Sequence, residues 1–287
     1  MAGVKEDGMA AKPVVAGADG SPESVRAVEW AAREAGLRGT SLRIIAVASM
    51  PPRMSPNPAT QDTVANRIEE ATNDALTTAA SQAGAAAPGV AVETDLVNHA
   101  SPANALVQAG QDALMLVLGS RGAGGFTALV LGSVSRYAAT NAACPVVVVR
   151  EETMTAHREI VVGVHDPAHA TAALGFAFEE AARRQAKLVA THARSRSPFD
   201  RHDEPADEEQ RALDALLATW REKYPDVQAS AEIMHAHPGR VLAGASARAD
   251  LVVIGRHGPD SGHGPGVGSI THSVLSHAHG PVVSVPD

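Results

Sequence analysis

The fold follows from two related stretches of sequence, LMLVLGSRGAGG at residues 114–125 and LVVIGRHG at residues 251–258. Each is an uninterrupted apolar run that leads into a loop containing glycine. A short apolar run without alternation is typical of a parallel β-strand that is buried on both faces. In both cases nine residues then lead from Gly122 or Gly258 to a Gly-Ser pair, where we expect a helix to begin. The sequence therefore predicts the succession strand, glycine loop and helix twice.

Both stretches belong to a longer internal repeat. Residues 98–149 align with residues 234–285 at a constant offset of 136, and residues 14–31 align with residues 160–177 at an offset of 146. The first copy is therefore longer than the second between these aligned segments by the difference of the two offsets. That region of the first copy carries the proline-rich run PPRMSPNP at residues 51–58, which we expect to form a long surface loop. Two copies of about 140 residues predict two domains, because each is long enough for its own core.

Each copy alternates strand and helix patterns. In the first copy we expect strands at 14–17, 42–48, 90–97, 114–118 and 146–149. A first helix should open at Pro22 behind an N-cap at Ser21, with a helical stripe of Val25, Val28, Ala32 and Ala35, and further helices should span 63–83, 102–111 and 132–141. This alternation predicts an α/β fold of two tandem doubly wound, Rossmann-like domains, each a five-stranded parallel sheet with helices on both faces. We assign the chain to a disordered tail (1–12), a first domain (13–150), a linker (151–158) and a second domain (159–287).

Composition and charge exclude several classes of protein. The formal net charge of −8 disfavours a protein that binds nucleic acid by neutralising phosphates. No apolar run reaches 18 residues, so we expect no membrane span, and the first twelve residues lack the apolar core of a secretory signal. The single cysteine, Cys144, cannot form an internal disulfide. We therefore expect a cytoplasmic protein.

The glycine loops have the spacing G-x2-G-x9-G-[ST], which suits anion binding. Glycines let backbone N–H groups approach an anion closely, and a helix N-terminus adds unpaired donors and partial positive charge. The motif residues are Gly119, Gly122, Gly132 and Ser133 in the first copy and Gly255, Gly258, Gly268 and Ser269 in the second. Neighbouring residues expected in the same two cradles are Arg121, Val134, Ser135, Ile270 and Thr271, with Arg256 as a further charged group. The alternative interpretation is a pair of plain surface turns.

Catalytic and metal motifs are missing from the sequence. It contains no GxxxxGK[ST] phosphate loop, no GxSxG elbow and no HExxH or CxxC pattern. Ser133 and Ser135 can accept a phosphoryl group, but no general base stands at a fixed spacing from them. We therefore assign no catalytic residue and no metal ligand. His99 and His235 recur at equivalent positions before a helix, where a structural hydrogen bond is favoured over catalysis.

These loops, together with VAGADGS at residues 15–21, resemble the ATP-binding signature of the universal stress protein family in its tandem two-domain form. The resemblance covers nearly the whole chain outside the tail and the linker. It implies ATP or a related adenine nucleotide, with or without Mg²⁺. Asp19, between Ala18 and Gly20, matches the acidic residue that lies beside the nucleotide. Val47 and Ala193 match the positions whose backbone contacts adenine.

The second copy departs from this pattern. The ungapped alignment places His165 opposite Asp19 and Asp166 opposite Gly20, with Val164 preceding them. Asp166 is instead expected to cap a helix that opens at Pro167. Our hypothesis is that both copies bind nucleotide, and that the first binds it more reliably.

The resemblance implies a regulator of stress survival or growth that acts through nucleotide-dependent conformation or association, rather than an enzyme. The final strands, 146–149 and 282–285, are expected at sheet edges, where they offer pairing surfaces for a homodimer or for the two domains of one chain. A protein partner is expected but not identified. Two alternatives remain: a slow ATPase or self-phosphorylating enzyme that uses the same cradle, and a scaffold whose loops bind no nucleotide.

Overall fold

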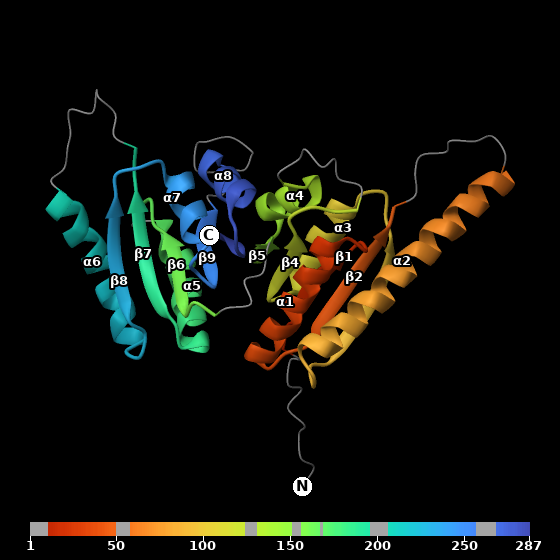
Figure 1. The fold of residues 1–287 in the computed structure, drawn as a ribbon, viewed down its shortest axis with the longest axis horizontal. Coiled ribbons are helices and arrows are strands. Elements are labelled where there is room, and N and C mark those ends of the chain that lie inside the picture. The colour runs from red at the N-terminus through yellow and green to blue at the C-terminus, as the bar shows by residue number, and fades with distance from the viewer. Residues whose placement is uncertain are drawn as a thin grey trace, which may run out of the picture.

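The computed structural model describes residues 11–49, 58–123, 131–150, 156–166, 169–195, 206–256 and 268–287. Several predictions concern residues outside these ranges: most of the expected tail (1–10), the proline-rich loop (51–57), part of the linker (151–155), Pro167 and Gly258. Within the described ranges strands and helices alternate along the chain, and the two halves lie side by side (Figure 1).

The helices and strands of the first half match the predicted order. Its strands are β1 (Val14–Ala18), β2 (Leu42–Ala48), β3 (Val92–Asn98), β4 (Met115–Gly119) and β5 (Val146–Val149). Its helices are α1 (Pro22–Arg38), α2 (Pro58–Ala86), α3 (Pro102–Ala109) and α4 (Ser133–Asn141), with a short 3-10 turn at Gly110–Asp112. Ser21 caps α1 as expected, because its hydroxyl accepts the Ser24 N–H at 3.1 Å.

The second half repeats this order. Its strands are β6 (Glu159–Gly163), β7 (Lys187–Ala193), β8 (Ala229–Met234), β9 (Leu251–Arg256) and β10 (Val282–Pro286). Its helices are α5 (Thr171–Arg184), α6 (Ala206–Lys223), α7 (Pro238–Ala245) and α8 (Ser269–His277). No helix among the described residues has the length and apolarity needed to cross a membrane.

The described strands form one continuous sheet in the order β3-β2-β1-β4-β5-β10-β9-β6-β7-β8. All neighbouring strands within each half are parallel, which confirms two doubly wound domains. The halves meet where β5 and β10 pair antiparallel, with Val147 opposite Val283. The expected pairing of edge strands therefore occurs within one chain.

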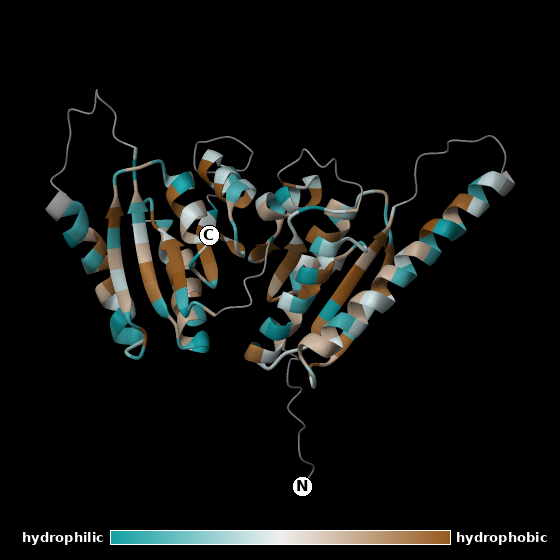
Figure 2. Cartoon of the chain, in the orientation of Figure 1, coloured by the Kyte–Doolittle hydropathy of each residue, from teal (hydrophilic) through white to brown (hydrophobic). Residues whose placement is uncertain are grey.

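The sheet is covered by helices on both faces, and most of the strand residues are apolar (Figure 2). In β1, Val14 and Ala16 pack beneath α1 and α2, while Val15 faces the opposite layer with α3 and α4. The second half has α5 and α6 on the first of these faces and α7 and α8 on the other. The core is built mainly from alanine, valine, leucine and isoleucine, as the low aromatic content requires.

Helix α5 begins later than the sequence suggested. Helix α5 starts at Thr171, and its N-cap, Ala170, makes no side-chain cap hydrogen bond. The predicted cap by Asp166 concerns a helix opening at Pro167, which lies outside the described residues. The Asp166 carboxylate lies 3.0 Å from the His169 ring, and the Asp166 carbonyl accepts the His169 N–H at 3.1 Å. Asp166 thus contacts His169, which lies just before α5.

The two halves also share a buried ring of four charges, which we call the interface quartet: Glu34 and Arg38 of α1, and Glu180 and Arg184 of α5. Each arginine donates to both carboxylates, so the four side chains form a closed cycle. The glutamates are at most 1% exposed. Burial opposes the charge of Arg184, but the two carboxylates outweigh it and raise the pKa of that guanidinium above its usual range.

The quartet follows the internal repeat. Glu180 and Arg184 stand 146 residues after Glu34 and Arg38, which is the offset of the two aligned fronts. Aromatic rings flank both ends: the Arg38 guanidinium lies 5.7 Å from the Phe176 ring, and that of Arg184 lies 5.8 Å from Trp30. The equivalent positions and the matching ring contacts show that the two copies meet with approximate two-fold symmetry.

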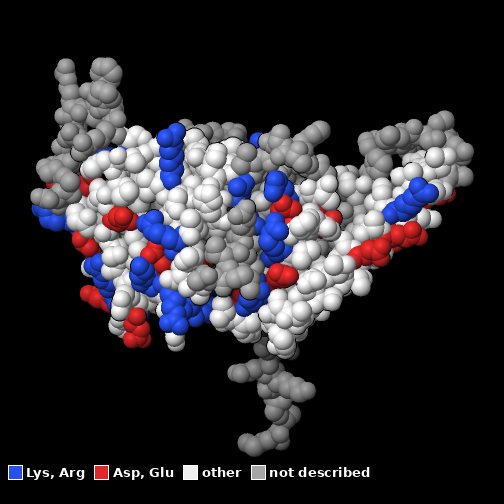
Figure 3. Space-filling view, viewed as in Figure 1, with Lys and Arg blue, Asp and Glu red and all other residues white. Residues whose placement is uncertain are grey.

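On the surface, Lys and Arg side chains gather over the middle of the face in Figure 3, with acidic side chains interspersed among them.

Candidate functional site

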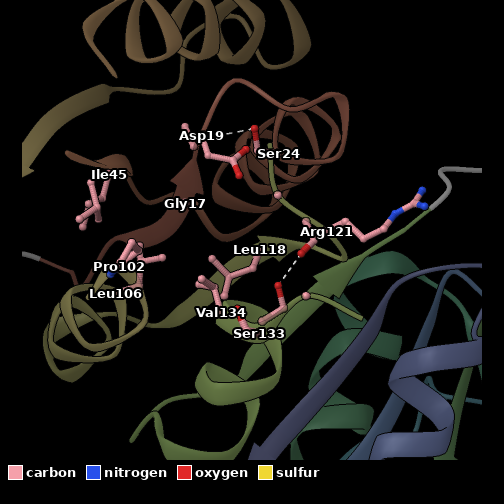
Figure 4. Close-up of a pocket in the computed structure, with 16 residues that line it drawn as sticks. Gly17, Asp19, Ser24, Ile45, Pro102, Leu106, Leu118, Arg121, Ser133 and Val134 are labelled. Atoms are coloured by element: carbon pink, nitrogen blue, oxygen red, sulfur yellow. Dashed lines mark hydrogen bonds between the residues drawn. The ribbon is translucent and has the colours of Figure 1, made fainter. Parts of the chain in front are cut away.

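A cavity of about 490 Å³ opens at the carboxyl ends of β1 and β4 in the first half. The chain runs outward from β1 to β2 and β3 and then returns to β4, so this is the switch point of the strand order, where doubly wound folds bind ligands. Figure 4 shows the cavity and the residues around it. The lining residues are Gly17, Ala18, Asp19, Ser24, Ile45, Val47, Pro102, Leu106, Leu118, Gly119, Arg121, Gly122, Gly132, Ser133, Val134 and Ser135.

Asp19 holds the glycine loop in place. One carboxylate oxygen accepts the Ser21 N–H at 3.0 Å and the Ser21 hydroxyl at 2.6 Å, and the other accepts the Ala123 N–H at 2.9 Å. A Cβ at Gly122 would stand 2.4 Å from this second oxygen, so a larger residue there would have to displace the Asp19 carboxylate. Gly20 has a positive φ of 79°, which lets the chain turn between Asp19 and α1.

Gly119 allows the start of α1 to pack directly on the loop. A Cβ there would stand 2.7 Å from the backbone carbon of Glu23, in the first turn of α1. The loop, the acidic residue and α1 therefore form one tightly packed unit around the polar end of the cavity.

The N-terminus of α4 supplies backbone donors. Its N-cap is Gly132, which offers no side-chain cap, and the first helical hydrogen bond runs from Arg136 N–H to the Gly132 carbonyl. The N–H groups of Ser133, Val134 and Ser135 thus have no partner within the helix. All three residues line the cavity, where the positive end of the helix dipole favours an anion.

The two serines of this turn differ in their surroundings. The Ser135 hydroxyl is buried and donates to the Gly119 carbonyl at 2.6 Å, so it ties α4 to β4. Ser133 is exposed at the cavity. Of the two hydroxyls expected to be able to accept a phosphoryl group, only that of Ser133 is accessible.

Neither arginine of the two motifs directs its guanidinium into this cavity. The Arg121 guanidinium points away from the cavity in Figure 4 and donates to Glu23 at 2.8 Å. The Arg256 guanidinium crosses to the first half, where it donates to the carbonyls of Ala139 and Ala142 at 3.3 and 2.6 Å. Its expected role as a charged helper at the second glycine loop is therefore corrected: it contacts the C-terminal end of α4.

The opposite wall of the cavity is apolar. Val47 lies near the end of β2, where the resemblance placed it, and Ile45 precedes it by two residues. Leu106 of α3 and Leu118 of β4 complete this wall. Six lining residues were not predicted from the sequence: Gly17, Ser24, Ile45, Pro102, Leu106 and Leu118. The internal repeat could have pointed to Leu106, because it aligns with Leu242 at the offset of 136. In the structure each of these leucines packs against a glycine in the first strand of its half, Gly17 or Gly163.

The residues expected in a second site also lie at the carboxyl edge of their half. Val164, His165 and Asp166 follow β6, Ala193 ends β7, Gly255 lies in β9, and Gly268, Ser269, Ile270 and Thr271 form the N-cap and first turn of α8. Gly258 is outside the described residues.

Their packing differs from that of the first site. A Cβ at Gly255 would meet its nearest neighbour, the Ala173 side chain, at an ordinary 3.7 Å, because α5 begins three residues later in the repeat than α1. The His192 ring lies 2.9 Å from the Val164 carbonyl, where the first half has an alanine on the matching strand. The two halves therefore do not present equivalent sites.

Two further predictions concern the histidines and metal binding in the described part of the chain. His99 Nδ1 accepts the Ser101 N–H at 2.9 Å, which confirms the expected structural hydrogen bond for that residue. No group of three or more His, Cys, Asp or Glu side chains with metal-binding geometry occurs among the residues described.

Comparison with known proteins gives the family. The profile described as universal stress protein family matches residues 10–150 and 157–286. A universal stress protein of Mycobacterium tuberculosis is 33% identical over 293 residues, which cover 94% of this chain and 95% of that protein. The crystal structure of a universal stress protein from Archaeoglobus fulgidus has a TM-score of 0.73 at 16% identity, covering 96% of this chain and 98% of that chain, and shares the fold.

A universal stress protein solved in complex with cAMP is 28% identical, with a TM-score of 0.38, and covers 48% of this chain and 96% of that chain. The two profile matches coincide with the two halves of the fold. The chain belongs to the universal stress protein family, and it contains two copies of the family's domain in tandem.

Proposed function

We propose that the first half binds ATP or a related adenine nucleotide in the cavity between β1 and β4. The observation that carries this proposal is the division of the cavity into two ends. One end presents the N–H donors of α4 and the glycine loop, and the other is lined by Ile45, Val47, Leu106 and Leu118. A volume of about 490 Å³ lies within the range of small-molecule sites, roughly 300–1,000 Å³.

The two ends suit the two parts of a nucleotide. Phosphates would accept hydrogen bonds from the N–H groups of Ser133, Val134 and Ser135, and a base would pack on the apolar wall beside the backbone of Val47. Asp19 acts mainly as a positioning residue, since its oxygens already accept three hydrogen bonds. A Mg²⁺ ion that arrives with the nucleotide would consequently be held through the phosphates rather than by this carboxylate alone.

We propose further that nucleotide occupancy regulates conformation or association in the cytoplasm, and that catalysis is not the main activity. Support comes from the Ser135 hydroxyl, which is committed to the Gly119 carbonyl, and from the structural role of Asp19. Pairing of the halves through β5 and β10 uses both valine-rich edges within the chain, so a homodimer through the same strands would have to compete with it. The second half is proposed to bind nucleotide more weakly than the first.

The deciding experiment is mass spectrometry of ligand released from freshly purified protein, followed by calorimetric titration with ATP, ADP, cAMP and GTP, with and without EDTA. We expect an adenine nucleotide, and loss of binding in Asp19→Ala. The matched control is Asp214→Asn, which changes an exposed carboxylate on α6. If no adenine nucleotide is released and none binds when added, the proposal is wrong and the scaffold alternative is favoured.

The enzyme alternative is tested in the same preparation. Release of phosphate from ATP and transfer of phosphate to the protein are followed over time, with Ser133→Ala as the variant for self-phosphorylation. We expect turnover far below that of ordinary enzymes, which is about 1–10³ s⁻¹. Turnover within that range that disappears in Asp19→Ala would overturn the choice of a regulatory protein.

A further inference from the structure

Helix α4 is anchored at both ends by different halves of the molecule. Its N-terminal turn lies at the first-half cavity and is tied to β4 through Ser135. Its C-terminal carbonyls face the second half. There the Arg256 guanidinium donates to Ala142 at 2.6 Å and to Ala139 at 3.3 Å, and the Ser284 hydroxyl donates to Ala139 at 3.2 Å.

Arg256 is placed for this contact by the sheet. It is the last residue of β9 and pairs with Pro286 of β10, the strand that joins the two halves. Its side chain is partly buried, and removal from water lowers the pKa of the guanidinium below its usual value while leaving it charged at neutral pH. A charged donor in such surroundings makes strong hydrogen bonds to carbonyl groups.

A cation at the C-terminus of a helix stabilises the helix and complements its dipole. The effect matters most for a short helix, and α4 has only nine residues. At a rise of about 1.5 Å per residue its two ends are roughly 13 Å apart, so Arg256 sits at the far end of α4 from the anion-binding turn. The hydrogen bonds of Arg256 therefore connect it to that turn along α4.

We propose that Arg256 of the second half is a positioning residue for the anion-binding turn of the first half. By tying the last carbonyls of α4 to the strand that joins the halves, it fixes the direction in which the N–H groups of Ser133, Val134 and Ser135 point. The first site is then completed by the second domain, and binding of a phosphate-bearing ligand depends on how the halves are joined. This inference rests on the proposed nucleotide site.

The chain offers a matched control. Arg150, which follows β5, donates at 3.3 Å to the carbonyl of Ala278, the C-cap residue of α8. It is an interface arginine on a helix C-terminus, like Arg256, but its helix belongs to the second half. Arg150→Gln therefore disturbs the interface without removing the contact on α4.

The experiment compares wild type, Arg256→Gln, Arg256→Lys and Arg150→Gln in titrations with ATP and with adenosine, which lacks phosphate. We expect Arg256→Gln to weaken ATP binding about threefold to tenfold and to leave adenosine binding unchanged. Arg256→Lys should lose less, because it keeps the charge. Arg150→Gln should match the wild type. Equal losses for ATP and adenosine, or equal losses in the two glutamine variants, would overturn the proposal.

Hydrogen exchange of the ligand-free proteins separates this inference from the nucleotide proposal. We expect the N–H groups of residues 136–142 to exchange faster in Arg256→Gln than in Arg150→Gln. If the wild type binds no nucleotide but this difference is present, the nucleotide site is wrong and the role of Arg256 in holding α4 stands. If exchange in α4 is the same in both variants, Arg256 does not position the helix.

Discussion

Replacing Glu180 with glutamine removes one negative charge from the interface quartet. Glu180 accepts hydrogen bonds from Arg38 and Arg184, and bonds to charged groups contribute about 1.5–3 kcal/mol each. Two such bonds amount to about 3–6 kcal/mol, which overlaps the loss of about 3–5 kcal/mol when one partner is removed from a buried ion pair. Glutamine keeps the shape and one acceptor oxygen. We therefore expect the free energy of unfolding to fall by about 3 kcal/mol.

The assay is urea unfolding followed by tryptophan fluorescence and circular dichroism. The two tryptophans report on different places, since Trp30 packs in the interface and Trp220 stacks on Phe178 in the second half. Separate transitions would show that the halves unfold independently, in which case each is fitted alone. Asp214→Asn serves as the control, because its partner Arg221 is also exposed and such pairs contribute at most about 1 kcal/mol.

A double variant tests whether unbalanced charge is the cause. Glu180→Gln with Arg184→Gln restores a neutral ring, so it should lose less than the sum of the single changes, with a coupling of about 0.5–3 kcal/mol. The reasoning is refuted if Glu180→Gln unfolds within about 1 kcal/mol of the wild type at the same denaturant dependence. It is also refuted if the losses of the two single variants simply add.

Four further predictions concern the glycine loops, Ser135 and Cys144. Gly119→Ala should abolish nucleotide binding and lower the melting temperature, because its Cβ would meet the Glu23 backbone at 2.7 Å, whereas Gly255→Ala should be tolerated at 3.7 Å from its nearest neighbour; equal melting temperatures would contradict this. Ser135→Ala should cost about 1–2 kcal/mol in urea unfolding by leaving the Gly119 carbonyl unpaired, and a change below about 0.5 kcal/mol would count against it. Burial raises the pKa of the Cys144 thiol, so iodoacetamide at pH 8 should alkylate the folded protein at least about tenfold more slowly than the unfolded chain. The raised value also means that the unfolded chain ionises first, so this thiol's contribution to stability should be complete below about pH 8.5 and decline above it.

The sequence predicted the features that depend on local pattern and repetition. The buried run 114–118, the Ser21 cap and the start of a helix at the first Gly-Ser pair each follow from rules that involve neighbouring residues, and the structure places them as expected. The repeat supplied the rest of the fold, because two copies of one pattern demand two similar domains.

Features that depend on contacts across the molecule were not predicted. Glu34 and Arg38 look like an ordinary pair of neighbouring charges on a helix, and only the meeting of α1 with α5 buries them. Arg256 was assigned to the wrong place because its sequence position beside a glycine loop says nothing about how far its side chain reaches. The apolar wall of the cavity could not be predicted, because it forms only when β2, α3 and β4 are packed together in the folded domain.

The antiparallel seam between β5 and β10 lies within a single molecule, and this makes it independent of dilution. Only nine residues separate the end of β5 at Val149 from the start of β6 at Glu159, so the two domains face each other at an effective concentration of about millimolar. Two separate chains held by the same strands would come apart as their concentration fell. The tandem chain keeps its halves together at the lowest copy number, and one molecule is enough to form the complete interface.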